Sequence, residues 1–302
     1  VKWGVKPGNY TFKTELFAPL LSVVCMNDLE EGLAFANSTE YGLTSGLQSL
    51  DEKEIALWKE KMEAGNLYIN RGITGAIVRR QPFGGMKRSA FGAGIKAGGH
   101  NYVSCFVEFT DLKASVIPED EYLLMARQSY AKAWENEFSV ERDVSHIIGE
   151  SNIFRYLPLK SMAVRLQDTD SLTDALLIMY GVANTPSPAV ISLSSSHPYI
   201  KEIKQEAESY NIPVIVQDED LFVSEMNKYE RIRTCSSDLS EAIYRKAAEL
   251  GLYIATHKPL SEGRIELLHY LKEQSISYEY HRYGSIIEEP THTQAAYEYS
   301  HS

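Results

Sequence analysis

The glycine-rich stretch at residues 70–103 holds the groups of this sequence that could most readily bind a ligand. It contains eight glycines and a Pro-Phe-Gly-Gly turn, so it predicts a folded loop system rather than a regular helix or strand. Gly75 and Ala76 stand in a Thr-Gly-Ala loop within it. Two successive backbone N–H groups in such a turn can form a nest for an anion, although a tight turn before Ile77 and Val78 is an alternative interpretation.

A second candidate group precedes this stretch, in the segment Glu15-Leu16-Phe17-Ala18-Pro19. A carboxylate such as that of Glu15 accepts two hydrogen bonds from a vicinal diol, so one glutamate can hold a ribose in place. The alternative interpretation is a surface glutamate at the start of a strand.

Neither the cysteines nor the histidines predict a reactive or metal-binding centre. Cys25, Cys105 and Cys235 form no CxxC pair and are odd in number, which fits a reducing compartment better than a disulfide framework. Their apolar or β-prone neighbours predict buried, structural thiols. The eight histidines are scattered without the spacing of a zinc site, so no metal is expected.

The charge and hydropathy of the chain restrict its partners. A formal net charge of −11 and the lack of a long basic run argue against a nucleic-acid partner. The cluster Arg79, Arg80, Lys87 and Arg88 predicts a solvated or subunit-contact surface, or else a patch that draws in an anionic substrate or cofactor. No run of about 18 apolar residues is present and Val1 does not open a signal peptide, so a cytoplasmic protein without a transmembrane segment is expected.

The elements expected to position the candidate groups alternate between strand and helix. Asp28 caps the first helix with Glu31 three residues on, and Gly65 stands in the stop position of the second helix. Strands joined by helices in this manner imply an α/β layer with a parallel sheet. The elements expected here are strands at 20–26, 67–70 and 102–110, the last a candidate oligomerisation edge, and helices that begin at 28 and 51.

The rest of the chain predicts a second α/β unit. A helix that begins at Pro118 carries Ala126, Tyr130, Trp134 and Phe138 on one packing face. From about residue 151 strands and helices alternate strictly, which is typical of a Rossmann-like three-layer domain. The expected strands lie at 161–166, 189–193, 213–217, 231–235, 253–256 and 275–280, and the expected helices at 171–182, 198–210, near 225, 238–250 and 264–273.

This second unit is not expected to bind a nucleotide. No Gly-x-Gly-x-x-Gly motif follows any of its strands, and its first strand–helix junction, at 167–174, is acidic where a pyrophosphate would need free amides. We predict three parts, which are residues 1–112, a helical linker at 113–150 and the Rossmann-like domain at 151–302. A half-ordered end is predicted for residues 290–302.

Three segments carry a family resemblance, namely TELFAPLLSVV at 14–24, ITGAIVRRQPFGG at 73–85 and IKAGGHNYV at 95–103. They resemble the carboxyl-terminal part of aldehyde dehydrogenases. The residues at 73–85 and 95–103 are most similar to those of the L-glutamate γ-semialdehyde (1-pyrroline-5-carboxylate) dehydrogenases, and within them to the dehydrogenase half of bifunctional proline utilization A. The resemblance is strong over roughly residues 1–107 and faint afterwards, and His100 stands where the family has a proline.

This resemblance implies an α/β fold in which the end of an aldehyde dehydrogenase catalytic domain precedes the Rossmann-like domain, itself of aldehyde-dehydrogenase-like fold without activity. It implies that Glu15 binds the nicotinamide ribose of NAD and that Phe17 lies close to the nicotinamide. It also implies that Gly75 and Ala76 hold the α-carboxylate of the substrate. Phe83 would line the aliphatic chain of the aldehyde, with core packing as its alternative role.

The resemblance further implies a reaction that this chain does not complete alone. The parent enzyme would oxidise L-glutamate γ-semialdehyde to glutamate with NAD in proline breakdown. The family's nucleophilic cysteine and general-base glutamate match no residue here, so no catalytic residue is predicted in this chain. The missing amino-terminal half and a second copy in a homo-oligomer are the expected partners. Two alternatives stay open: a non-catalytic oligomerisation unit whose residues 278–286 cover a neighbouring active site, or a dehydrogenase for another aldehyde.

Overall fold

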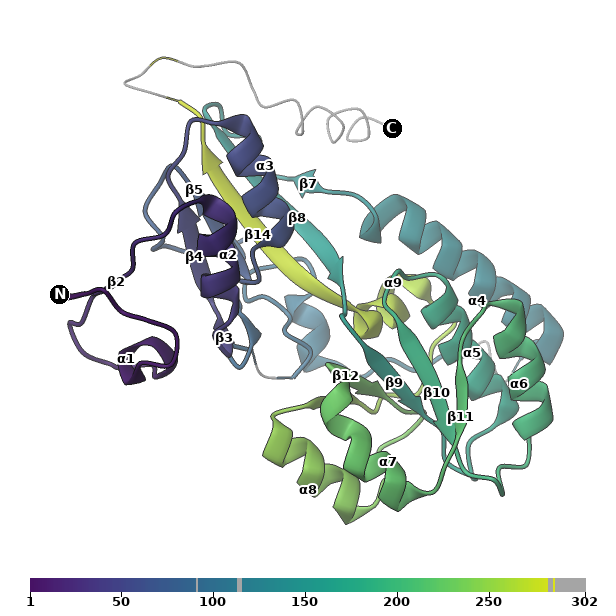
Figure 1. Cartoon of the computed structure of the whole chain (residues 1–302). Coiled ribbons are helices and arrows are strands. Elements are labelled where there is room, and N and C mark those ends of the chain that lie inside the picture. The colour runs from purple at the N-terminus through teal and green to yellow at the C-terminus, as the bar shows by residue number, and fades with distance from the viewer. Residues whose placement is uncertain (91, 113–115, 282–284, 286–302) are drawn as a thin grey trace.

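Two five-stranded sheets organise the protein, for which a computed structural model describes residues 1–90, 92–112, 116–281 and 285 (Figure 1). The described strands are β1 (Lys2–Trp3), β2 (Ser22–Val23), β3 (Tyr41–Gly42), β4 (Thr44–Leu47), β5 (Asn66–Ile69), β6 (Met86–Lys87), β7 (Arg142–Asp143), β8 (Glu150–Pro158), β9 (Met162–Arg165), β10 (Ala189–Leu193), β11 (Val214–Val216), β12 (Arg231–Arg233), β13 (Tyr253–Ala255) and β14 (Leu271–Glu279). The described α-helices are α1 (Tyr10–Lys13), α2 (Leu29–Asn37), α3 (Glu52–Lys61), α4 (Glu119–Ala133), α5 (Leu172–Ala183), α6 (Ile200–Ser209), α7 (Glu219–Glu225), α8 (Glu241–Leu250) and α9 (Gly263–Glu266). Across these residues, no helix has both the length and the apolar character needed to cross a membrane.

The first sheet has the strand order β4-β5-β14-β8-β7 and joins the early and late parts of the chain. Strand β14 runs parallel to β5, with Ser275 opposite Asn66, and antiparallel to β8 along all of its nine residues. Figure 1 shows the yellow β14 between the dark β5 and the teal β8. One face of the sheet packs against α2 and α3, where Leu33, Trp58 and Ile276 are buried together.

The two helices on this sheet begin at aspartate caps, as the sequence predicts for the first of them. The Asp28 carboxylate accepts the N–H of Glu31 at 2.8 Å, and the Glu31 carboxylate accepts the N–H of Asn27 at 2.8 Å. The expected stop at Gly65 is wrong, because α3 already ends at Lys61. Gly65 is needed for a close approach instead, since a Cβ there would lie 2.0 Å from the carbonyl oxygen of Gly84.

The second sheet is entirely parallel and has the strand order of a doubly wound fold. Counted along the chain from β9, its strands stand in the order 3-2-1-4-5. Helices α4, α5 and α6 pack on one face, where Val164 and Ile203 are buried. Helices α7 and α8 pack on the other, where Phe222 and Ile243 are buried. The expected Rossmann-like three-layer fold is therefore confirmed for β9 to β13. The strand expected in this domain at 275–280 is wrongly assigned, because it is part of β14 and pairs with β5 and β8 in the first sheet.

The aromatic stripe that follows Pro118 is a packing face, as expected. Helix α4 continues into a π-helical turn at Trp134–Phe138. Ala126, Tyr130 and Phe138 are at most 2% exposed, and Trp134 packs beside them in the core of the second domain.

Two strands expected in the first part are wrong in extent or in kind. The strand expected at 20–26 is reduced to β2, which pairs with β1 over two residues. The strand expected at 102–110 is a 3₁₀-helix at Tyr102–Phe106. The carbonyl of Asn101 accepts both the N–H and the hydroxyl of Ser104, at 3.0 and 2.6 Å, and this turn replaces strand pairing.

The helix expected at 264–273 is also wrong in its second half. Helix α9 and a 3₁₀-helix at Leu267–Tyr270 end before Leu271, where β14 begins. Leu271 pairs with Pro158 of β8, a strand that the sequence pattern did not predict. Partnership across the sheet thus overrides the local helical pattern.

The predicted domain boundaries at residues 112 and 150 stay predictions. Strand β8 begins at residue 150 and β14 lies later in the sequence, and both extend the sheet that β4 and β5 begin. The predicted half-ordered end at 290–302 lies outside the described residues. So do residues 282–284 and 286 of the segment 278–286, for which a covering role is an open alternative.

We expect Gly65→Ala to destabilise the protein, because forcing atoms into a packed site costs about 1–3 kcal/mol. The matched control is Gly32→Ala in α2, where the nearest atom to an added Cβ is 3.9 Å away. There the loss of a helical glycine should stabilise the protein by about 0.5–1 kcal/mol. Urea unfolding measures both variants, and equal midpoints would contradict the prediction.

Candidate functional site

The candidate anion site lies in loop 72–80, which leaves the carboxyl end of β5 through Asn70. Asn70 has a left-handed φ of 56°. Its side chain accepts the N–H of Ser49 at 2.9 Å and donates to the Ser49 carbonyl at 2.8 Å. These paired bonds fix the start of the loop to the segment after β4.

The backbone of Gly75 and Ala76 is open for a ligand. Both residues are exposed, and neither amide donates a hydrogen bond to another group among the described residues. Gly75 has a φ of 105°, which favours glycine, and a Cβ there would meet nothing within 4 Å. The Gly75 carbonyl is held by the hydroxyl of buried Tyr68 at 2.8 Å. Adjacent free amides on an anchored turn can bind a carboxylate or another small anion.

A short neck closes this loop. The N–H of Ile77 donates to the Gln81 carbonyl at 3.3 Å, and the N–H of Gln81 donates to the Ile77 carbonyl at 2.7 Å. Arg79 takes a left-handed φ of 65° and donates its N–H to the Gly98 carbonyl at 2.8 Å. The loop is thereby tied to the second half of the glycine-rich stretch.

Phe83 lies three residues beyond the loop and is half-buried. Its N–H and carbonyl bond to the carbonyl and N–H of Ala97 at 3.0 and 2.9 Å. This pairing positions the Phe83 backbone next to the loop that carries Gly75. Its role as a wall for an aliphatic chain stays a prediction.

A buried lysine and a buried glutamate anchor the turn after Phe83. Lys96 is fully buried, and its ammonium donates to the Gly84 carbonyl. Burial lowers the pKa of Lys96 to about 7. Glu273 of β14 accepts the N–H of Lys96 and the side-chain amide of Asn101, both at 2.7 Å. Burial raises the pKa of the Glu273 carboxyl.

Glu15 and Phe17 are not brought against the loop by any hydrogen bond or ion pair among the described residues. Both are exposed, and the Phe17 side chain is 99% exposed. They lie in the segment between α1 and β2. The sequence predicts them as NAD contacts, and this assignment stays a prediction.

The expectation that all three thiols are buried is wrong for two of them. Cys25 and Cys105 are exposed, because one follows the two-residue strand β2 and the other lies in a 3₁₀-turn, while Cys235 is buried. The protein atoms around the exposed Cys105 thiol displace some of its hydration and raise its pKa, and burial raises the pKa of the Cys235 thiol. Neither shift favours a reactive thiolate. No cluster of metal-ligating side chains occurs within the described ranges.

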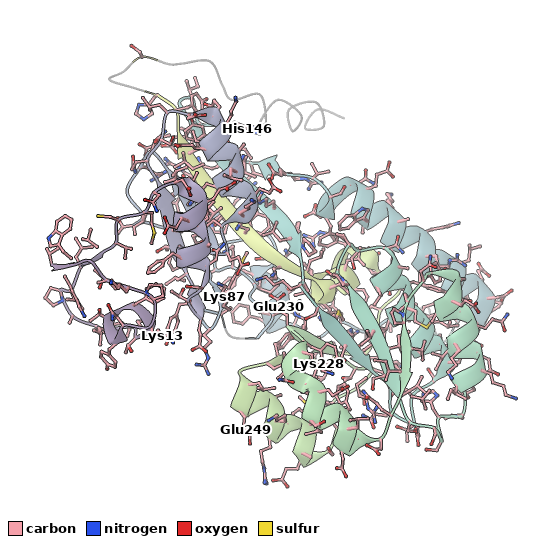
Figure 2. The ribbon with its side chains drawn as sticks, in the orientation of Figure 1. Lys13, Lys87, His146, Lys228, Glu230 and Glu249 are labelled. Atoms are coloured by element: carbon pink, nitrogen blue, oxygen red, sulfur yellow. The ribbon has the colours of Figure 1, made fainter. Side chains whose placement is uncertain are left out.

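Three cations of the basic cluster are paired within the chain. Arg80 binds Glu150, Lys87 lies 2.9 Å from a Glu63 oxygen and Arg88 lies 2.9 Å from a Glu40 oxygen. Lys87 and Glu230, labelled in Figure 2, line a groove of about 1070 Å³ between the two sheets. None of the five predicted site residues lines this groove.

The junction after β9 carries charge unsuited to a pyrophosphate. The Asp168 carboxylate accepts hydroxyl hydrogen bonds from Ser194 and, at 2.6 Å, from Ser196. These bonds hold the pKa of Asp168 below its ordinary value, so the group stays ionised at the carboxyl end of the sheet. The absence of nucleotide binding in this domain stays a prediction that this charge supports.

Sequence reasoning missed the residues that support the loop. Tyr68 shows only a strand-like position next to apolar neighbours, and nothing in the local sequence reveals that its hydroxyl reaches Gly75. Glu273 and Ser277 are missed because they lie far along the chain. Strand β14 brings Glu273 to Lys96 and Ser277 to Gln81, at the end of the loop.

Comparison with known proteins shows that the first part of the chain is similar to a protein family. Residues 1–112 match the model described as the aldehyde dehydrogenase family. The matched range contains every one of the predicted site residues: Glu15, Phe17, Gly75, Ala76 and Phe83.

Individual proteins and solved structures are similar to parts of this chain or to most of it. The 1-pyrroline-5-carboxylate dehydrogenase of Bacillus mycoides (strain KBAB4) is 44% identical over 96 residues, which are 32% of this chain and 18% of that protein. The structure of proline utilization A from Corynebacterium freiburgense is 34% identical, covers 94% of this chain and 28% of that chain, and has a TM-score of 0.70. A 1-pyrroline-5-carboxylate dehydrogenase from Thermus with bound NAD is 42% identical, covers 35% of this chain and 20% of that chain, and has a TM-score of 0.34.

The chain therefore spans less than a third of the length of each of these relatives. The similarity to the Corynebacterium structure reaches well beyond residue 112, into the Rossmann-like domain. Most of the chain, and not only the part that matches the family model, thus has a counterpart in a solved structure.

We expect the unfolding free energy to rise with pH above 7 because of Lys96. Its pKa falls from 10.5 to about 7 on folding, so between these values the unfolded chain holds a proton that the folded chain has released. Burial of Lys96 lowers the unfolding free energy most strongly below the folded pKa. As the pH rises above that pKa, the unfolding free energy increases by up to about 1.4 kcal/mol per pH unit.

Denaturant unfolding of the wild type and of Lys96→Met at about pH 7.5 and about pH 9 measures this linkage. The wild type should gain stability relative to the variant at the higher pH. If the unfolding free energies of the two proteins change by the same amount between the two pH values, Lys96 keeps its ordinary pKa in the folded state.

Proposed function

We propose that this chain is the C-terminal portion of an NAD-dependent 1-pyrroline-5-carboxylate dehydrogenase, which oxidises L-glutamate γ-semialdehyde to glutamate in proline catabolism. The observation that carries the proposal is the pair of open amides at Gly75 and Ala76. They lie within the aldehyde dehydrogenase segment, and relatives of this chain are named for that activity.

The chemistry of the substrate explains why such amides would matter. The semialdehyde carries an α-carboxylate at the end opposite the reacting carbonyl. Hydrogen bonds from amides to a carboxylate are charge-assisted and short, so two of them fix both the position and the orientation of that end. A neutral aldehyde would gain nothing from Gly75 and Ala76, which makes the loop a selectivity element.

The residues of this chain fit part of an NAD site. The Glu15 carboxylate is exposed and has no hydrogen-bond partner among the described residues, so both oxygens can accept from ribose hydroxyls. The exposed ring of Phe17 offers an apolar face two residues away. NAD, when bound, supplies the hydride acceptor, while these two side chains orient it.

The remainder of the parent protein supplies the reacting groups in this proposal. Aldehyde oxidation needs a thiolate nucleophile and a base for the hydrolytic water. The raised pKa values of Cys105 and Cys235 do not suit the first role. Exposed apolar side chains on the family segment, including Trp3, Leu21 and Val78, offer surface on which the missing part would pack.

A homo-oligomer completes the proposed assembly. Val103 and Phe106 are each 71% exposed, in the segment 102–110 that the sequence predicts as an oligomerisation edge. This segment is a 3₁₀-turn and not a strand, so a subunit contact there would be made by side chains.

Activity assays separate the candidate functions. The full-length protein should reduce NAD with glutamate semialdehyde, and the isolated chain should not. Turnover by the isolated chain would contradict the assignment of the reacting groups to the missing part. A full-length protein that prefers a neutral aldehyde would favour the alternative of a different substrate, and one without dehydrogenase activity would favour a purely architectural role.

We expect Ala76→Pro to weaken selection for the carboxylate, because proline has no N–H to donate. A hydrogen bond to a charged group is worth about 1.5–3 kcal/mol, so KM for the semialdehyde should rise by about 10- to 100-fold. KM for pentanal, which has the same chain length but neither the carboxylate nor the α-amino group, should change little.

The matched control is Ala76→Ser, which keeps the backbone N–H and should keep the KM of the wild type for both substrates. An equal rise in both KM values for Ala76→Pro would contradict carboxylate binding by this amide and would indicate general distortion of the loop.

A further inference from the structure

The hydroxyl of Ser277 in β14 is fully used by groups that flank loop 72–80. Its Oγ accepts from Nη1 of Arg71 at 2.7 Å and from Nε2 of Gln81 at 3.0 Å, and it donates to Oδ1 of Asn152 at 2.7 Å. A hydroxyl offers one donor and two acceptor sites, so all of its capacity is occupied. Ser277 is 3% exposed and Asn152 is 2% exposed.

These bonds hold both ends of the loop that carries the open amides. Arg71 directly precedes loop 72–80 and Gln81 directly follows it. Gln81 is 4% exposed and also pairs with Ile77 inside the loop. One oxygen atom, on a strand late in the chain, therefore bonds to side chains at both ends of the loop.

Strand β8 completes the support from the other side. Asn152 donates its side-chain amide to Glu150 Oε2 at 3.1 Å, and Glu150 binds the guanidinium of Arg80 at the end of the loop. Arg71 Nη1 lies 3.8 Å from the same carboxylate. The charges around the loop ends are thus balanced by carboxylates and polar atoms of β8 and β14.

We propose that Ser277, acting with Asn152, is a positioning residue that sets the geometry of the carboxylate-binding amides. This inference rests on the proposed function of the loop. Ser277 does not touch the substrate; it acts through Arg71 and Gln81. Selectivity for a carboxylate-bearing aldehyde is then determined in part by the late strands β8 and β14, outside the family segment.

Burial makes this support sensitive to a single atom. Removing the Ser277 oxygen takes a hydrogen-bond partner from Nη1 of Arg71. It also leaves Nε2 of the buried Gln81 with only its longer bond to Oδ1 of Asn152, at 3.4 Å. Groups that lose a partner in this way shift to find new ones. A shift at both ends of a short loop moves the amides between them. Two amides that bind one carboxylate tolerate little displacement, because hydrogen bonds weaken steeply away from linear geometry.

The test compares substrates with and without the carboxylate in the full-length protein. For Ser277→Ala we expect KM for glutamate semialdehyde to rise by about tenfold, the effect of losing one good hydrogen bond, with KM for pentanal and kcat for both changed less than about twofold. Ser277→Thr keeps the hydroxyl and should restore selectivity. Equal effects on the two substrates, or none, would overturn the proposal.

A matched control removes a similar hydroxyl elsewhere. Ser187 is 5% exposed, accepts the N–H of Leu159 and donates to the Tyr270 carbonyl, all within the second domain. Ser187→Ala should lose stability without changing the ratio of the two KM values. If Ser277→Ala does not fold, Gln81→Met removes one donor to the same hydroxyl at similar volume. It should likewise raise KM for glutamate semialdehyde without raising KM for pentanal.

The two proposals fail in different ways. A wild-type protein without semialdehyde activity overturns the proposed function, and this inference with it. A wild-type protein that oxidises the semialdehyde while Ser277→Ala and Gln81→Met keep its selectivity overturns only the positioning role of Ser277.

Discussion

The pairing of β14 with β5 is the interaction on which the rest of this structure depends. Strand β5 carries the start of the candidate site and has β4 on one edge only, so its other edge needs a partner for its backbone groups. The buried polar side chains of β14 find their partners in the early part of the chain. Glu273 accepts from the Lys96 backbone, Gln274 donates to the Ala64 carbonyl and Ser275 donates to the Pro82 carbonyl. Because an unpaired buried polar group is costly, these bonds are satisfied together in one register.

The parts of the fold that sequence reasoning predicted are those decided locally. Helix caps such as Asp28 and the apolar strand β10 depend on neighbouring residues, and both are found as expected. Strand β8 was missed because Ser151 and Asn152 look like exposed positions, whereas both are buried by contacts across the sheet. The end of the helix expected at 264–273 was misplaced for the same reason, since residues 271–274 favour strand only when β8 lies beside them.

The candidate site likewise has a part that the local sequence predicts and a part that it does not. The turn at Gly75 and Ala76 could be predicted because a glycine with positive φ and two adjacent amides are properties of a few consecutive residues. Its supports could not, because Tyr68 acts through a hydroxyl on a buried strand and Ser277 acts from another part of the chain. The prediction of buried thiols failed where apolar neighbours, as around Cys25, lie on a short strand without a covering layer.

The late position of β14 also has a consequence for synthesis of the protein. Ser275 bonds to Asn66, 209 positions earlier in the chain. At about 5–20 residues per second, a ribosome delivers β14 on the order of 10–40 seconds after β5. During that interval the open edge of β5 is a template for wrong partners. Its length of four residues limits how firmly any such partner can be held before the native strand arrives.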